Sequence, residues 1–74
     1  TELDRLQIGQ RIKTIREKQN WTLEQFGLLV DNASKGTVSN WENGVYVPDK
    51  KRLSLIALLG NTQVDWILYG IADT

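Results

Sequence analysis

The sequence predicts an all-α fold, a compact five-helix bundle formed by a single domain over residues 1–74. Apolar residues recur with the period of an amphipathic helix, and residues that begin or end helices stand between those stretches. The strict polar–apolar alternation typical of a strand does not occur, and 74 residues support only one small core. The expected helices span residues 5–19, 23–31, 35–43, 50–59 and 63–69.

The first two expected helices are defined by an apolar stripe and by capping signals. The helix over 5–19 carries isoleucines at helical spacing: Ile8, Ile12 and Ile15. For the second helix, Thr22 is expected to cap the N-terminus with Gln25 as its capping-box partner, and Trp21 to pack on Phe26. Three residues of this helix are expected to face the core: Phe26, Leu29 and Val30.

The remaining helices are also bounded by residues that cap or end helices. Ser34 is expected to cap a short third helix that turns Val38 and Trp41 inward and ends at Asn43–Gly44. Asp49 is expected to cap the fourth helix, whose inward residues are Leu53, Ile56 and Ala57. The last helix is expected to be capped by Thr62 with Asp65, to end at Gly70, and to bury Val64, Ile67 and Leu68.

Composition excludes several classes of function. The chain contains no cysteine and no histidine, so thiolate and imidazole metal sites and the usual general base are absent. We therefore expect neither a metal nor another cofactor, and no enzymatic activity. No apolar run approaches the roughly 20 residues that a membrane-spanning helix needs. A cytoplasmic protein is expected.

Charge is segregated along the chain although the net charge is zero. Residues 19–34 and 53–74 contain acidic residues but no lysine or arginine. Such segregation is typical either of an ordinary solvated surface or of a one-sided electrostatic footprint for an anionic partner. Sequence context has to decide between the two.

That context comes from the third helix, which follows the second after a tight connection. Two short helices joined in this way match a helix-turn-helix, although a plain helical hairpin in a small bundle has a similar outline. The outer face of the third helix is small and polar, and no acidic residue precedes Glu42. Four of its residues occupy the positions that approach base edges when such a helix enters the major groove: Lys35, Gly36, Ser39 and Asn40.

Residues 8–70 resemble the lambda repressor/Cro-type (XRE) helix-turn-helix family, and most closely the N-terminal domains of phage and prophage repressors. The resemblance rests on the order and spacing of five motifs: RIKTIR (11–16), WTLEQF (21–26), TVSNWENG (37–44), VPD (47–49) and VDWILYG (64–70). It implies a transcriptional repressor that binds a double-stranded DNA operator, with residues 35–43 as the recognition helix. Such repressors often carry a downstream oligomerisation domain, which would lie outside this chain.

The resemblance also assigns roles to individual residues. It places base reading at Lys35, Gly36, Ser39 and Asn40. It implies contacts with the DNA backbone by Ser34, Thr37, Asn43, Tyr46, Lys50, Lys51, Arg11 and Lys13. Arg16 and Glu42 correspond to a partly buried ion pair that positions the recognition helix. The chain departs from the family at Leu23, commonly a phosphate-binding glutamine, at Gly36, commonly a polar residue, and in the turn 31–33, which is one residue longer.

The glycine at position 36 has two interpretations: it permits a close approach of the helix backbone to DNA, or it relieves the tight turn before the helix.

A domain of this size reads few base pairs, so a homodimer on two half-sites about 34 Å apart is expected, with weak or no self-association by the isolated domain. Its interface is expected to use Trp66, Tyr69 and Ile71, unless they cover the core. The alternative function is an antitoxin-type protein-interaction module that also binds its own promoter.

Overall fold

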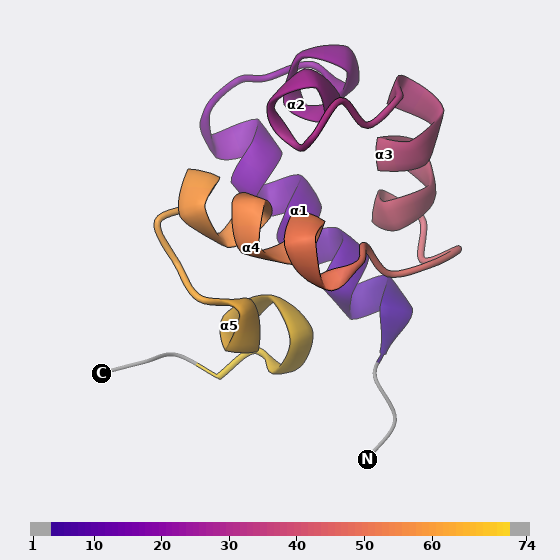
Figure 1. Cartoon of the computed structure of the whole chain (residues 1–74). Coiled ribbons are helices and arrows are strands. Elements are labelled where there is room, and N and C mark those ends of the chain that lie inside the picture. Colours follow the sequence, from indigo (N-terminus) through magenta and orange to yellow (C-terminus); the bar gives the residue numbers. More distant parts are fainter. Residues whose placement is uncertain (1–3, 72–74) are drawn as a thin grey trace.

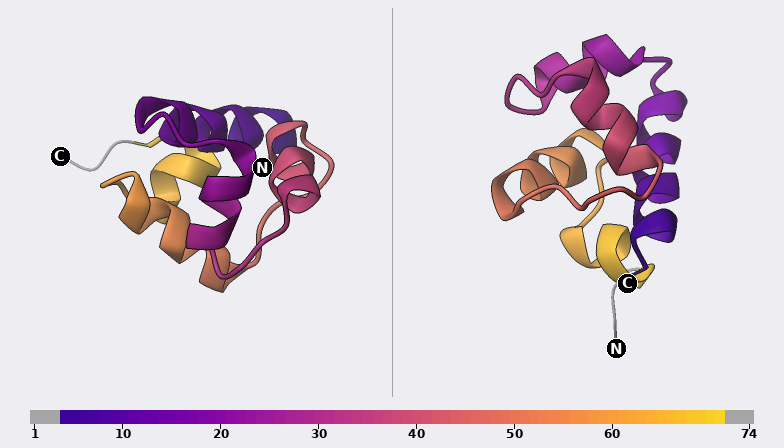
Figure 2. Two further views of the ribbon diagram at one scale, coloured as in Figure 1. Left: turned by 90° about the horizontal axis from the view of Figure 1, so that it is seen from above. Right: turned by 90° about the vertical axis from the view of Figure 1, so that its right-hand side faces the viewer.

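Five helices make up the computed structural model, which describes residues 4–71 (Figure 1). Their bounds are α1 (Arg5–Lys18), α2 (Leu23–Leu29), α3 (Lys35–Glu42), α4 (Lys50–Leu59) and α5 (Val64–Tyr69). No strand occurs among these residues, and the expected all-α class is confirmed. Helix α1 forms one side of the domain, and the other four helices lie on the same side of it (Figure 2). It packs on α3, α4 and α5, while α2 packs on α3 and α4 on α5.

The expected caps of α2, α3 and α4 are confirmed, the last by Asp49, whose carboxylate accepts from Arg52 N (2.9 Å), and an unpredicted cap begins α1. The Asp4 carboxylate accepts hydrogen bonds from the first-turn amides of α1, and Ser34 Oγ accepts one from Thr37 N (3.1 Å). At α2, Thr22 Oγ1 accepts from Gln25 N (3.0 Å) and Gln25 Oε1 accepts from Thr22 N (2.9 Å). This reciprocal pair is the predicted capping box, and it satisfies two amides that the helix itself leaves unpaired.

Two expectations about helix ends are wrong. Helix α2 ends at Leu29 rather than at residue 31, because Asp31 and Asn32 both adopt left-handed backbone angles (φ 52° and 58°). Thr62 does not cap α5, where Gln63 is the N-cap. The amide of Thr62 instead donates to Ala57 O (2.9 Å), closing a Schellman turn with Asn61 left-handed at φ 52°. Thr62 therefore completes the end of α4.

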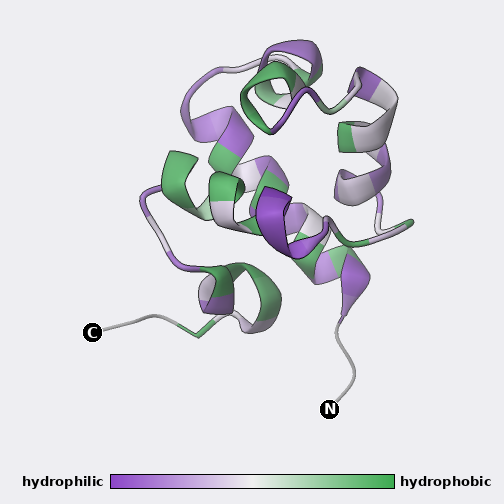
Figure 3. Cartoon of the chain, in the orientation of Figure 1, coloured by the Kyte–Doolittle hydropathy of each residue, from purple (hydrophilic) through white to green (hydrophobic). Residues whose placement is uncertain are grey.

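The core lies between α1 and the other helices. Its buried apolar residues are Ile8, Ile12, Ile15, Phe26, Val30, Ala33, Val38, Trp41, Leu53, Ile56, Ala57 and Ile67. Val64, Leu68 and Trp66 are partly buried against it. Leu29, expected inside, is 46% exposed because the inward positions of this seven-residue helix and its C-cap are taken by Phe26, Gly27 and Val30. Helix α3 is coloured mostly white and purple in Figure 3, so it presents a polar surface outside this core.

Candidate nucleic-acid interface

The angle between α2 and α3 is set by the turn that joins them. Ala33 N donates to Gly27 O (2.8 Å), which folds the turn back onto α2. A Cβ on Gly27 would overlap the carbonyl oxygen of Ala33, so only glycine permits this approach. Asp31 and Asn32 supply the two left-handed residues that reverse the chain, which both residue types tolerate. The two helices are therefore held as a rigid pair.

Helix α1 fixes the C-terminal half of α3. A Cβ on Gly9 would overlap the carbonyl oxygen of Trp41, which shows how closely α1 approaches the end of α3. Arg16 and Glu42 form a bidentate ion pair, with Nε–Oε2 at 2.6 Å and Nη2–Oε1 at 3.1 Å. The side chains are 14% and 8% exposed, respectively. Arg16 Nη1 also donates to Trp21 O (2.9 Å), so one guanidinium links α1, α3 and the start of α2.

The electrostatics of this ion pair keep both charges away from the outer face of α3. The hydrogen bond to Glu42 raises the pKa of Arg16, opposed by its burial and supported by the charges of Glu42 and Glu17. Glu42 is the acidic residue of α3, and its carboxylate is turned inward to Arg16. The outer face of α3 therefore presents no carboxylate to an approaching anion.

That outer face carries the four residues expected to read bases. Lys35 and Gly36 are exposed in the first turn, and Ser39 and Asn40 are half-buried one turn later. A Cβ on Gly36 would meet nothing within 4 Å, and Gly36 is not left-handed. The fold therefore does not require glycine there, and relief of the turn does not explain it. At the helical period these four residues share one side of α3.

Short hydrogen bonds between neighbours order the polar side chains of this region. Asn40 Nδ2 donates to Tyr46 Oη (2.9 Å), and Asn43 Nδ2 donates to Ser39 Oγ (3.2 Å). Ser34 Oγ and Thr37 Oγ1 lie 2.8 Å apart at the start of the helix. Each of these side chains therefore has a hydrogen-bond partner on the protein surface.

The lysines expected at the DNA backbone lie on different elements. Lys50 and Lys13 are exposed on α4 and α1. Lys51 Nζ lies 3.5 Å from Asp31 Oδ2 in an exposed ion pair, with the side chains 73% and 45% exposed. Such exposed pairs contribute little to stability, so Lys51 can exchange Asp31 for another anion at little cost.

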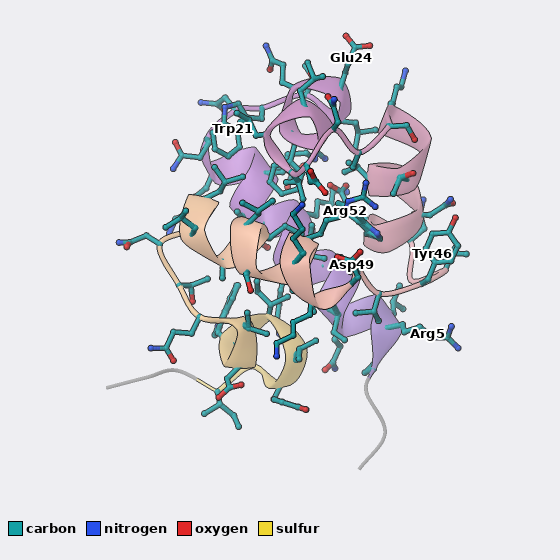
Figure 4. The ribbon with its side chains drawn as sticks, in the orientation of Figure 1. Arg5, Trp21, Glu24, Tyr46, Asp49 and Arg52 are labelled. Carbon is teal, nitrogen blue, oxygen red and sulfur yellow. The ribbon has the colours of Figure 1, made fainter. Side chains whose placement is uncertain are left out.

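Besides Arg16, three arginines link a helix to a distant part of the chain. Arg11 Nη1 donates to Ile67 O (3.0 Å) in α5, away from α3. Arg52 Nη2 donates to Asp31 O (3.3 Å), and its guanidinium lies 6.0 Å from the Trp41 ring, between α4 and α3 (Figure 4). Arg5 Nη1 donates to Val45 O (3.1 Å). The links of Arg5 and Arg52 had no sequence signal, because each joins residues at least 21 positions apart.

This arrangement is that of a known family. Residues 12–67 match the sequence profile of the helix-turn-helix family. The chain belongs to the XRE-type helix-turn-helix family. Within it, α2 and α3 are the paired helices, and Leu23, which replaces the usual glutamine, is partly buried against the core. None of the helices within residues 4–71 is long and apolar enough to cross a membrane.

Solved structures with the same fold include several regulators. The P22 c2 repressor in complex with a synthetic operator is 25% identical, with a TM-score of 0.80 over 96% of this chain and 100% of that chain. SinR, a master regulator for biofilm formation from Bacillus subtilis, was solved in complex with DNA; it is 23% identical, with a TM-score of 0.70 over 81% of this chain and 95% of that chain.

An enzyme also contains the fold. HppE in complex with its substrate is 21% identical over 88% of this chain but only 36% of its own, with a TM-score of 0.73. A likeness at this level concerns the fold alone. No curated protein sequence matches the chain.

Proposed function

We propose that this helix-turn-helix domain is the DNA-binding part of a transcriptional repressor, which inserts α3 into the major groove of an operator half-site. The observation that carries the proposal is the outer face of α3, which is free of carboxylates and is presented by a helix anchored at both ends. In helix-turn-helix proteins the N-terminal residues of the second helix contact base edges. Lys35 and Gly36 stand at that end.

Each side chain of this face has a defined use. The Lys35 ammonium suits guanine O6 and N7, and the Asn40 amide suits adenine N6 and N7. Ser39 can serve either base. The open space at Gly36 leaves room for DNA to approach the helix backbone. These four residues are the proposed base-reading set.

Contacts with phosphates would fix the register of α3 and supply salt-dependent affinity. We assign them to six residues that the structure leaves exposed or half-buried: Ser34, Thr37, Asn43, Lys50, Lys51 and Lys13. Arg11 is omitted because α5 engages its guanidinium. Two-fold pairing on half-sites about one helical turn apart would supply the remaining selectivity. For that homodimer, Tyr69 and Ile71 are 55% and 62% exposed and available for an interface.

The test is fluorescence anisotropy with a randomised duplex pool across a salt series, followed by sequencing of the bound fraction. We expect log K to fall linearly with log salt, by about 0.9 per phosphate neutralised, and an inverted repeat to be enriched. Lys35→Ala should relax preference within the repeat. Lys18→Ala is the matched control, because Lys18 is exposed at the far end of α1 beside Gly60 and Trp66. Absence of salt-dependent binding to any duplex would refute the proposed function.

A further inference from the structure

We propose that Tyr46 is a positioning residue for Asn40: its hydroxyl holds the Asn40 side-chain amide in place and thereby strengthens the preference of the domain for the base that Asn40 reads. The inference rests on the proposed function and replaces the phosphate contact that the family resemblance implies for Tyr46. It begins from the 2.9 Å hydrogen bond between Asn40 Nδ2 and Tyr46 Oη. Tyr46 lies beside the C-terminal turn of α3 in Figure 4.

The backbone before Tyr46 is fixed by the end of α3. Gly44 is left-handed at φ 77°, its amide donates to Trp41 O (3.2 Å), and the amide of Val45 donates to Asn40 O (2.9 Å). These two bonds form a Schellman motif. A Cβ on Gly44 would also lie 3.1 Å from Leu6 Cα, so the left-handed angle and the packing both favour glycine. The motif connects the backbone of Asn40 directly to the residue before Tyr46.

Helix α1 holds the same segment from its other side. Arg5 Nη1 donates to Val45 O (3.1 Å). Both polar groups of the Val45 backbone are therefore engaged, one by α3 and one by α1. The side chain of Tyr46 starts from a fixed point and reaches back to Asn40 across a six-residue separation. The bond between the two side chains is thus a consequence of how the segment is anchored.

The chemistry of the amide makes this bond relevant to base reading. An asparagine side chain has two N–H donors and one carbonyl acceptor, and its terminal torsion is broad, so a free amide samples both orientations. Tyr46 Oη accepts one N–H of Asn40. The other N–H and the carbonyl remain, which is the donor–acceptor pair that adenine N7 and N6 require. Tyr46 thus restrains the Asn40 side chain before DNA arrives and leaves that donor–acceptor pair available.

Two phenylalanine variants isolate this effect in the free protein. Tyr46→Phe removes the hydroxyl at a 49% exposed site, and Tyr69→Phe makes the same change at a 55% exposed site on α5. In NMR spectra without DNA, we expect the Asn40 side-chain amide to shift and to exchange faster with water in Tyr46→Phe only. Unchanged Asn40 resonances and exchange in Tyr46→Phe would overturn the inference. Equal melting temperatures of the two variants would establish that both remain folded.

The second measurement uses a panel of duplexes that vary each position of the selected repeat. Asn40→Ala identifies the position that Asn40 reads. Tyr46→Phe should reduce the ratio of affinities for the preferred and the other bases at that position by about fivefold, which corresponds to the free energy of one hydrogen bond. The substitution should not change the salt dependence of binding. It should have no further effect in the Asn40→Ala background. A uniform loss of affinity across all duplexes would mean that Tyr46 contacts a phosphate. An unchanged base preference would mean that Tyr46 does not position Asn40. Either result overturns the inference. Failure of the wild type to bind DNA would instead refute the proposed function.

Discussion

Replacing Glu42 with glutamine tests whether the ion pair with Arg16 positions the recognition helix. The substitution keeps the shape of the side chain and removes its charge. Arg16 donates to both carboxylate oxygens at 2.6 and 3.1 Å, and both side chains are largely shielded from water. The glutamine retains one acceptor oxygen, while its NH₂ group faces the other donor. Arg16 is then left partly buried with one charge-assisted hydrogen bond missing.

The expected cost follows from that geometry. Removing one partner of a fully buried pair costs about 3–5 kcal/mol, and loss of a single hydrogen bond to a charged group about 1.5–3 kcal/mol. Because the pair is not completely buried and one acceptor survives, we expect about 2–3 kcal/mol. In a domain of this size each kcal/mol lowers Tm by about 4–8 °C, so a decrease of about 10–20 °C is expected.

Thermal unfolding followed by circular dichroism measures this change. Glu24→Gln is the matched control, since Glu24 points into solvent from α2 (Figure 4), and it should change stability by no more than about 0.5 kcal/mol. The pKa of Arg16 is raised, so the contribution of its charge is complete below its ordinary pKa and is lost only as pH rises through the higher folded value. The difference between variants should therefore be constant through the slightly alkaline range. If Glu42→Gln were no more destabilising than Glu24→Gln, the ion pair would not hold α3.

Three further predictions concern glycines and Arg11. Gly36→Ala should stabilise the domain by about 0.5–1 kcal/mol, because the new methyl group enters open space on a helix, and it should weaken operator binding. Lower stability would contradict the structure, and unchanged binding would contradict a close approach of DNA. Gly27→Ala should cost at least about 2 kcal/mol in chemical denaturation, because its Cβ overlaps the Ala33 carbonyl; a neutral result would mean that the turn is not rigid. Arg11→Met should lower stability by about 1 kcal/mol through loss of the hydrogen bond to Ile67 O. It should leave the slope of log K against log salt for DNA binding unchanged, whereas a slope smaller by about 0.9 would mean that Arg11 contacts a phosphate.

Local features of the fold could be predicted because their causes lie within about two helical turns. The Thr22–Gln25 capping box, the Ser34 and Asp49 caps, and the apolar spacing of α1 are interactions between residues three to seven positions apart. The same reasoning failed at Thr62, where two local roles competed. A threonine before a helix is typical of an N-cap. Here the left-handed backbone of Asn61 instead places the amide of Thr62 so that it donates to Ala57 O at the end of α4.

For the candidate site, the sequence alone determined which residue types occupy the outer face of α3, because helical period and a nearby cap fix the direction of each side chain. Only the tertiary structure decided which neighbours those side chains have. The bond of Asn40 to Tyr46 and the diversion of Arg11 to α5 depend on segments that meet after folding. The pair of Glu42 with Arg16 also joins distant segments, and it was predicted only through the family resemblance. Backbone reversals at Gly44 and residues 31–32 bring those segments together. The spacing of apolar and polar residues in the sequence does not predict the resulting distances.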